Sequence, residues 1–221
     1  MKQEEIIMGF FQKEKRDKLE RYRHLNKYVK KGQILFTGSS LMEQFPINEI
    51  MLNHGMNQII YNRGIGGYTI PEMLDAMDEQ ILALEPSKIF INIGTNDISR
   101  PEETTEKLIA DYRKVLTQIK EKLPKAKVYM MAYYPVNVRV AAKQPWPNAD
   151  VAAKLRLERL GECNAAVEKL AEEFGYRYID VNQGLTDADG QTKEEYSIDG
   201  IHMWCDAYEI VFENMKEYIL E

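Results

Sequence analysis

Five short apolar runs, separated by segments of helical periodicity, most constrain the fold of this 221-residue chain. The runs are mostly continuously apolar, and this pattern is typical of strands that are buried on both faces of a sheet. Strands that alternate with helices form βαβ units, which build a parallel sheet covered by helices on both faces. The five predicted strands are residues 34–37, 59–61, 89–93, 128–133 and 176–180.

Apolar side chains at helical spacing lie between the predicted strands. One stripe begins at a capping-box pattern, in which Thr69 is followed by Pro71 and Glu72. Few topologies connect such elements, and we expect a flavodoxin-like five-stranded parallel sheet. The chain is therefore predicted to be a single α/β domain over residues 1–221, a three-layer αβα sandwich with an N-terminal helical segment (1–31) packed on it. The stripes are Leu74, Met77, Ile81 and Leu84; Leu108, Tyr112, Val115 and Ile119; Leu160, Cys163, Val167, Leu170 and Phe174; and Val211, Met215 and Tyr218.

Charge and composition disfavour several classes of partner. The chain has 35 acidic against 29 basic residues, a net charge of −6, which argues against nucleic acid as a ligand. The one dense basic stretch, residues 13–23, is interleaved with acidic residues and is interpreted as a solvated helix face. No apolar run approaches the roughly 18 residues that a membrane span needs. With two cysteines and no secretory signal, we expect a cytoplasmic protein without stable membrane insertion, and a homodimer is left open.

Polar blocks follow the predicted strands, where ligands bind in open α/β sheets. They supply the residue types of acyl transfer: a hydroxyl at a strand-to-helix turn, a late histidine as general base, and a carboxylate to orient it. Asparagine and glycine at neighbouring strand ends offer donors for an oxyanion. The blocks are 38–41 (Gly-Ser-Ser-Leu), 62–69 (Asn-Arg-Gly-Ile-Gly-Gly-Tyr-Thr), 94–97 (Gly-Thr-Asn-Asp) and 199–202 (Asp-Gly-Ile-His).

The order and content of these four blocks resemble the SGNH hydrolases, also called the GDSL lipase/acylhydrolase family. The resemblance extends over roughly residues 34–205, and the chain is most similar to bacterial platelet-activating-factor acetylhydrolase-like members. It implies Ser40 as nucleophile, His202 as general base and Asp199 as the acid that orients it. It also implies an oxyanion hole made of the Ser40 N–H, the Gly67 N–H and the Asn96 side-chain amide.

The sequence departs from the family pattern in three places. Ser39 replaces the aspartate that names the motif, and Tyr68 stands where close relatives often carry aspartate. After His202 comes Met203-Trp204 rather than the more usual proline or leucine. We expect Ser39, Tyr68 and Trp204 to border the substrate pocket.

Other interpretations of the same residues are weaker. The segment 64–69 reads G-x-G-x-x-T and lacks the third glycine of a dinucleotide fingerprint. Three histidines without metal-binding spacing make a zinc site unexpected. Cys205 lies near His202 in the sequence, but no block with oxyanion donors accompanies it. Ser40 is therefore preferred as nucleophile. The irregular region 134–150 either covers the site or is a connection without a role.

The sequence therefore predicts a serine esterase that hydrolyses short-chain, acetyl-type esters of a small molecule through an acyl-enzyme, with neither cofactor nor metal. The short chain leaves little room for a deep lipid lid, which favours small acyl groups. The alcohol stays open between a carbohydrate and a lysophospholipid. The alternative is a non-catalytic flavodoxin-like module that binds a small molecule or an acylated glycan.

Overall fold

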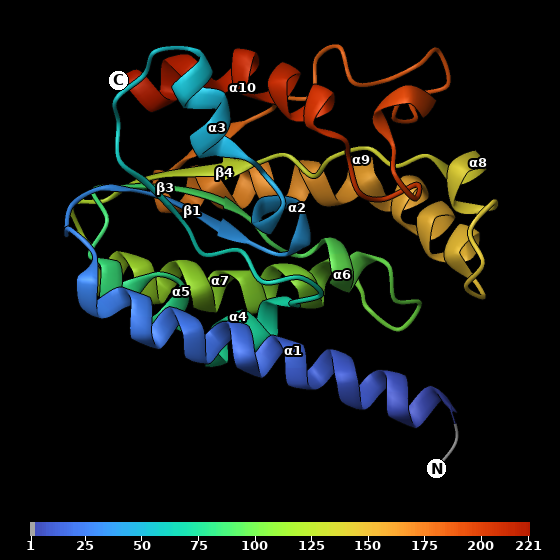
Figure 1. Ribbon diagram of the computed structural model, residues 1–221, viewed down its shortest axis with the longest axis horizontal. Helices are drawn as coiled ribbons and strands as arrows, with labels where there is room; N and C mark the ends of the chain where they lie inside the picture. Colours follow the sequence, from blue (N-terminus) through green and yellow to red (C-terminus); the bar gives the residue numbers. More distant parts are fainter. Residues whose placement is uncertain (1–2) are drawn as a thin grey trace.

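The computed structural model describes residues 3–221, with side chains from Glu5 onward. All five strands of its sheet are parallel, in the order β2-β1-β3-β4-β5. Helices lie on both faces of the sheet (Figure 1), which confirms the predicted flavodoxin-like three-layer αβα sandwich. The strands are β1 (Ile34–Gly38), β2 (Ile60–Asn62), β3 (Lys88–Asn92), β4 (Lys127–Met131) and β5 (Arg177–Ile179).

Side chains of each strand alternate between two apolar clusters, one on each face of the sheet. Leu35 belongs to the cluster formed with α4 (Ile70–Asp75), α7 (Thr105–Lys122) and α9 (Ala149–Phe174). Phe36 belongs to the cluster formed with α2 (Ser40–Glu43), α3 (Ile47–Asn53) and α10 (Cys205–Leu220). The predicted stripe on α7 is buried at all four positions, and the α9 stripe is buried at its centre.

β3 begins at a charged residue that an apolar pattern could not include. The Lys88 side chain is buried, and its ammonium donates to the backbone oxygens of Tyr218 and Ile219 at 2.7 and 2.8 Å. A buried ammonium is tolerated when such partners replace its hydration. These bonds also fix the end of α10 against the sheet.

The first predicted helix is interrupted. The capping box at Thr69 is present, but α4 gives way at Ala76 to the short α5 (Met77–Gln80) and a 3-10 turn (Leu82–Leu84). Here Gln80 is fully buried, and its amide donates to the backbone oxygens of Gly38 and Arg63 at 3.2 and 2.7 Å. The break therefore accompanies a polar side chain that reaches behind the end of β1, which an apolar stripe does not predict.

The N-terminal helix α1 (Gln3–Leu25) runs along the outside of α4 and α5 (Figure 1) and continues into a 3-10 turn (Asn26–Tyr28). No helix in residues 3–221 is long and apolar enough to cross a membrane. The remaining short elements are α6 (Thr95–Ile98), α8 (Val138–Ala141), which lies in the region predicted to be irregular, and a 3-10 turn (Glu194–Tyr196).

Candidate active site

Ser40 is placed by a tight turn at the carboxyl end of β1. Gly38 has a φ of +151°, and a Cβ atom there would lie 2.0 Å from the backbone oxygen of Asn92. Only glycine fits so close a contact. The Ser39 N–H donates to the same oxygen at 3.3 Å, and Ser40 then begins α2 as a half-buried residue. The close approach of two neighbouring strands thus sets the position of the Ser40 hydroxyl.

His202 links this hydroxyl to a carboxylate. Its Nε2 lies 2.9 Å from Ser40 Oγ, and its Nδ1 lies 2.7 Å from Asp199 Oδ2. The other carboxylate oxygen, Oδ1, accepts the backbone N–H groups of Ile201 at 2.9 Å and His202 at 2.8 Å. The structure therefore brings together Ser40, His202 and Asp199 in the hydrogen-bonded order of a nucleophile, a base and an orienting acid.

The Asp199 carboxyl is held in its charged form. Burial alone would raise its pKa, but the hydrogen bonds from the His202 ring and backbone outweigh this effect and lower the pKa of Asp199 to about 2. A carboxylate at this position favours the ring tautomer with its proton on Nδ1. The Nε2 lone pair is then directed at the Ser40 hydroxyl.

The turn between Asp199 and His202 rests on the segment that was predicted to be irregular. Gly200 has a φ of +93°, and a Cβ there would lie 2.6 Å from the backbone oxygen of Asn137 and from the backbone nitrogen of Ala141. The Asn137 N–H donates to the Gly200 oxygen at 2.7 Å. Residues 134–150 thus pack against the turn that carries Asp199 and His202. None of them lines the pocket beside Ser40.

Three candidate oxyanion donors belong to residues that line the cavity beside Ser40. Neither the Ser40 N–H nor the Gly67 N–H has an acceptor among residues 3–221. The Asn96 side-chain amide donates one hydrogen to the Tyr68 carbonyl at 2.8 Å, which leaves its second hydrogen free. All three residues contribute to the same cavity wall. The arrangement can bind an oxyanion that forms on a carbonyl attacked by Ser40.

Asp97 fixes residues 62–69, here called the glycine block, against α6. Both of its carboxylate oxygens lie 3.2 Å from the Ile70 N–H at the start of α4. Burial raises the pKa of Asp97 to about 7, against the opposing effect of the Ile70 N–H. Asp97 therefore titrates near neutral pH, unlike Asp199.

A cavity of about 460 Å³ opens beside Ser40, and much of its wall comes from α1. Lys15 and Lys18 contribute to this wall, so the prediction that residues 13–23 form a solvated face is wrong for these two lysines. The sequence carried no signal for this role, because acidic residues alternate with the lysines as on any exposed helix. The residues that line the cavity are Met8, Phe11, Gln12, Glu14, Lys15, Lys18, Ser40, Glu43, Gln44, Gly66, Gly67, Glu72, Asn96, Arg100 and His202.

Ser39, Tyr68 and Trp204 lie outside this lining. Ser39 is fully buried, with its hydroxyl 3.3 Å from that of Thr95, so it joins the first polar block to the third. Tyr68 is buried and contributes its backbone oxygen to Asn96. Trp204 is half-exposed at the start of α10.

A buried arginine near the triad was also not predicted. Arg156 of α9 is 2% exposed, and its Nε donates to Ser99 Oγ at 3.0 Å. Burial lowers the pKa of Arg156 to about 10, while the negative charge of Asp199 acts in the opposite direction. The Arg156 guanidinium therefore places a positive charge close enough to interact electrostatically with Asp199.

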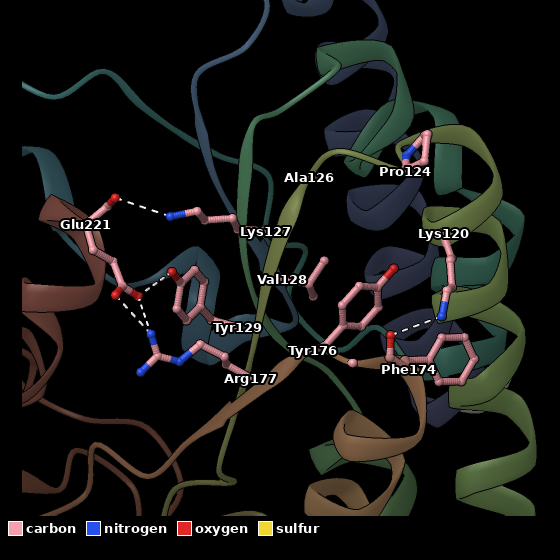
Figure 2. Close-up of a pocket in the computed structure, with 11 residues that line it drawn as sticks. Lys120, Pro124, Ala126, Lys127, Val128, Tyr129, Phe174, Tyr176, Arg177 and Glu221 are labelled. Atoms are coloured by element: carbon pink, nitrogen blue, oxygen red, sulfur yellow. Dashed lines mark hydrogen bonds and ion pairs between the residues drawn. The ribbon is translucent and has the colours of Figure 1, made fainter.

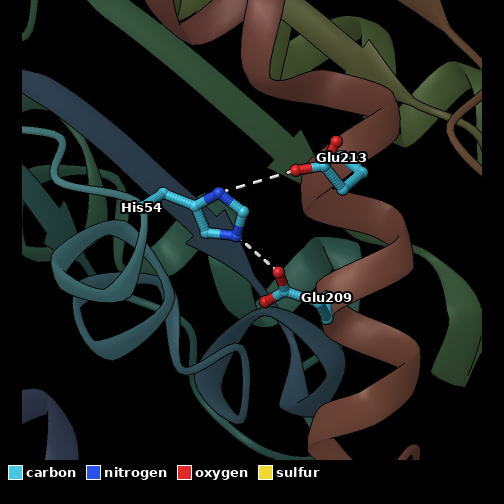
Figure 3. Close-up of side chains that lie close together, drawn as sticks. All are labelled: His54, Glu209 and Glu213. Carbon is cyan, nitrogen blue, oxygen red and sulfur yellow. Dashed lines mark hydrogen bonds and ion pairs between the residues drawn. The ribbon is translucent and has the colours of Figure 1, made fainter.

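One group in the described part of the chain has the composition of a metal site: His54, Glu209 and Glu213 (Figure 3). His54 Nε2 contacts Glu209, and its Nδ1 lies 3.6 Å from Glu213 Oε1. One possible ligand atom from each of the three residues lies within 4.8 Å of the others, and each ring nitrogen already has a carboxylate partner. The contacts of the His54 ring with the two carboxylates link the end of α3 to α10.

A second cavity, of about 430 Å³, lies at the amino ends of β4 and β5 (Figure 2). Its basic side chains are already bonded within the protein. Lys120 donates to the Phe174 backbone oxygen at 3.1 Å, and Arg177 forms two bonds to the Glu221 carboxylate, at 2.6 and 2.9 Å. It contains none of the residues that acyl transfer requires.

Comparison with known proteins gives a family match. The profile of the GDSL-like lipase/acylhydrolase family matches residues 49–210, more than half of the chain, and so includes Gly67, Asn96, Asp199 and His202 but begins after Ser40. A solved structure described as a candidate platelet activating factor, from Streptococcus pneumoniae, is 28% identical, with 97% of each chain covered and a TM-score of 0.84.

Two further relatives are more distant. A GDSL-like lipase from Bacteroides thetaiotaomicron VPI-5482 shares the fold at 21% identity, with 91% of this chain and 97% of that chain covered and a TM-score of 0.74. An N-acylneuraminate cytidylyltransferase from Escherichia coli O18:K1:H7 (strain RS218 / NMEC) is 24% identical over 226 residues. That match covers 97% of this chain and 49% of the relative, so the chain spans about half the length of the curated relative it matches.

Proposed function

Because this chain belongs to the GDSL-like lipase/acylhydrolase family, we propose that it hydrolyses carboxylic esters of short acyl groups through an acyl-enzyme on Ser40. The observation that carries the proposal is the unbroken hydrogen-bonded line from Asp199 through His202 to Ser40, with contacts of 2.7 and 2.9 Å. Unpaired donors on the same cavity wall support it, since they can stabilise the charge that develops on the carbonyl oxygen.

The chemistry follows from these positions. Ser40 Oγ bonds to the acyl carbon while its proton passes to His202 Nε2, and Asp199 stabilises the resulting imidazolium. His202 then protonates the alcohol oxygen as its bond to the acyl carbon breaks. Water then attacks the acyl carbon of the acyl-enzyme while His202 Nε2 takes its proton. His202 passes this proton to Ser40 Oγ as the bond between Oγ and the acyl carbon breaks and the carboxylic acid leaves.

The cavity lining favours a short acyl group and a polar alcohol. Met8 and Phe11 are its only large apolar side chains, and both are more than half exposed. Binding a long acyl chain would require a larger apolar surface, because each buried methylene contributes only about 0.8 kcal/mol. The rest of the lining is charged or polar, which suits an alcohol rich in hydroxyl groups, such as a sugar.

Steady-state kinetics test the proposal. Nitrophenyl esters of increasing acyl length, together with acetylated sugars, should be hydrolysed with the highest kcat/KM for acetyl. The Ser40→Ala variant should lose turnover, whereas Ser39→Ala, altered at the neighbouring buried serine, should keep it. If the wild-type chain turns over none of these esters, the alternative of a non-catalytic module that binds an acylated ligand replaces the proposal.

A further inference from the structure

The glycine block carries a backbone N–H whose direction decides whether the oxyanion hole exists. The Gly67 N–H belongs to the peptide unit between Gly66 and Gly67, and neither residue has a side chain to restrict it. Glycine populates both signs of φ at little cost, and Gly67 itself has a φ of +74°. Rotation of this peptide unit would exchange the position of the Gly67 N–H for that of the Gly66 carbonyl oxygen.

The two neighbouring peptide units are held directly or indirectly by lysines of α1. On one side, the Lys15 ammonium donates to the Gly67 carbonyl oxygen at 2.8 Å. On the other side, the Gly66 N–H donates to Glu43 Oε2 at 2.7 Å, and Lys18 pairs with the same carboxylate, 2.9 Å from Oε1 and 3.1 Å from Oε2. The two lysines are three residues apart and therefore lie on one face of the helix.

The Lys15 contact has features that a surface ion pair lacks. The Lys15 side chain is only 16% exposed, against 66% for Lys13 on the same helix. Its ammonium also bonds to Glu72 Oε1 at 2.7 Å and lies 5.5 Å from the centre of the Tyr68 ring. Burial would raise the pKa of Glu72, but its bonds with Lys15 and Thr69 lower it, so the carboxylate that holds Lys15 stays charged.

We infer that Lys15 is a positioning residue of the hydrolase: it holds the glycine block so that the Gly67 N–H faces the oxyanion, with Lys18 and Glu43 fixing the other side. The N-terminal helix thereby becomes part of the catalytic apparatus and not only a layer packed on the sheet. This inference rests on the proposed function, because it assigns Lys15 a role in the same reaction.

The test compares Lys15→Met with Lys13→Met and Lys15→Arg in the full chain. For acetyl esters we expect Lys15→Met to lower kcat per titrated serine about tenfold with little change in KM, less than the roughly 10²–10³-fold loss on deleting a donor. Inhibition by a trifluoromethyl ketone, which forms an oxyanion on the serine, should weaken by a similar factor. Lys15→Arg should recover much of the loss, and Lys13→Met should match the wild type.

A measurement without turnover separates failure of this inference from failure of the proposed function. Amide hydrogen exchange of the peptide covering residues 62–70 should be faster in Lys15→Met than in Lys13→Met at equal global stability. Unchanged kcat, inhibitor affinity and exchange in Lys15→Met would overturn the inference. So would a loss of active protein with normal kcat per titrated serine, since that is a purely structural effect. If the wild type has no esterase activity, the proposed function fails, and hydrogen exchange still decides whether Lys15 holds the glycine block.

Discussion

The side-chain amide of Asn96 donates a hydrogen bond of 2.8 Å to the backbone oxygen of Tyr68, so α6, which follows β3, is tied directly to the glycine block. Tyr68 follows Gly67, whose N–H is the neighbouring oxyanion donor. One side chain thus supplies a donor of its own and fixes the segment that carries another.

Replacing Asn96 by alanine removes both effects. We expect Asn96→Ala to lower kcat by at least about 10²–10³-fold, or about 3–4 kcal/mol of transition-state stabilisation, with KM for a small ester little changed. Steady-state kinetics with nitrophenyl acetate check this. A variant that loses less than about tenfold in kcat would mean that Asn96 does not contact the oxyanion.

Asp199 should be essential for rate while remaining charged at every working pH. Its pKa of about 2 lies below its ordinary value, so its contribution to stability is present above about pH 4 and is lost only as the pH falls towards 2. Asp199→Asn should lower kcat by about 10⁴-fold, because the amide favours the wrong ring tautomer of His202. The measurement is kcat at neutral pH in a variant with wild-type circular dichroism; near-normal turnover would contradict the assignment.

The raised pKa of Asp97 predicts a dependence of stability on pH that is opposite to that of Asp199. Because its pKa is raised to about 7, the folded protein binds more protons than the unfolded chain between about pH 4 and 7. This group therefore makes the free energy of unfolding fall as the pH rises through that window, by an amount on the order of 4 kcal/mol. Urea denaturation at several pH values should show the fall in the wild type and a smaller fall in Asp97→Asn. Equal slopes in the two proteins would contradict the prediction.

Phe11 should contribute to substrate binding through α1. It lines the cavity beside Ser40, whereas its neighbour Phe10 is 67% exposed and does not. Phe11→Ala should raise KM for nitrophenyl esters about fivefold with kcat nearly unchanged, the pattern of lost uniform binding. Phe10→Ala serves as the matched control and should behave as the wild type. Identical KM values in the two variants would exclude Phe11 from the substrate pocket.

Gly200 should tolerate no side chain. A Cβ at this position would lie 2.6 Å from Asn137 and Ala141, and its φ of +93° strains any other residue. Gly200→Ala should therefore destabilise the fold by about 2 kcal/mol or more and displace the Asp199–His202 turn. Urea denaturation and kcat measured together would reveal both effects. An unchanged free energy of unfolding together with an unchanged kcat would show that residues 134–150 do not support the turn.

The sequence predicted the triad because each of its blocks stands at a local boundary. Ser40 follows a strand, and Asp199 and His202 lie three residues apart on one turn before the last helix. A parallel sheet brings such boundaries to one edge, and the resemblance to the GDSL family assigned the role of each residue. The capping box at Thr69 was predictable for the same reason, since it involves only four consecutive residues.

Features that depend on docking between distant segments were not predictable. Lys15 and Lys18 have acidic neighbours in sequence and look like solvent-facing residues, and only the packing of α1 brings them to Gly67 and Glu43. The break at Ala76 has the same origin, because it accompanies the hydrogen bonds of the Gln80 amide to the backbone oxygens of Gly38 and Arg63. Arg156 is buried although it is charged, and the apolar periodicity along α9 does not predict the burial of a charged side chain.

Covalent labelling tests the central claim most directly. A fluorophosphonate probe should modify the wild-type chain once, and peptide mass spectrometry should place the label on Ser40. His202→Ala should react far more slowly, and Ser40→Ala should not react. Labelling at another residue, or equal labelling of wild type and Ser40→Ala, would contradict the assignment of Ser40 as the nucleophile.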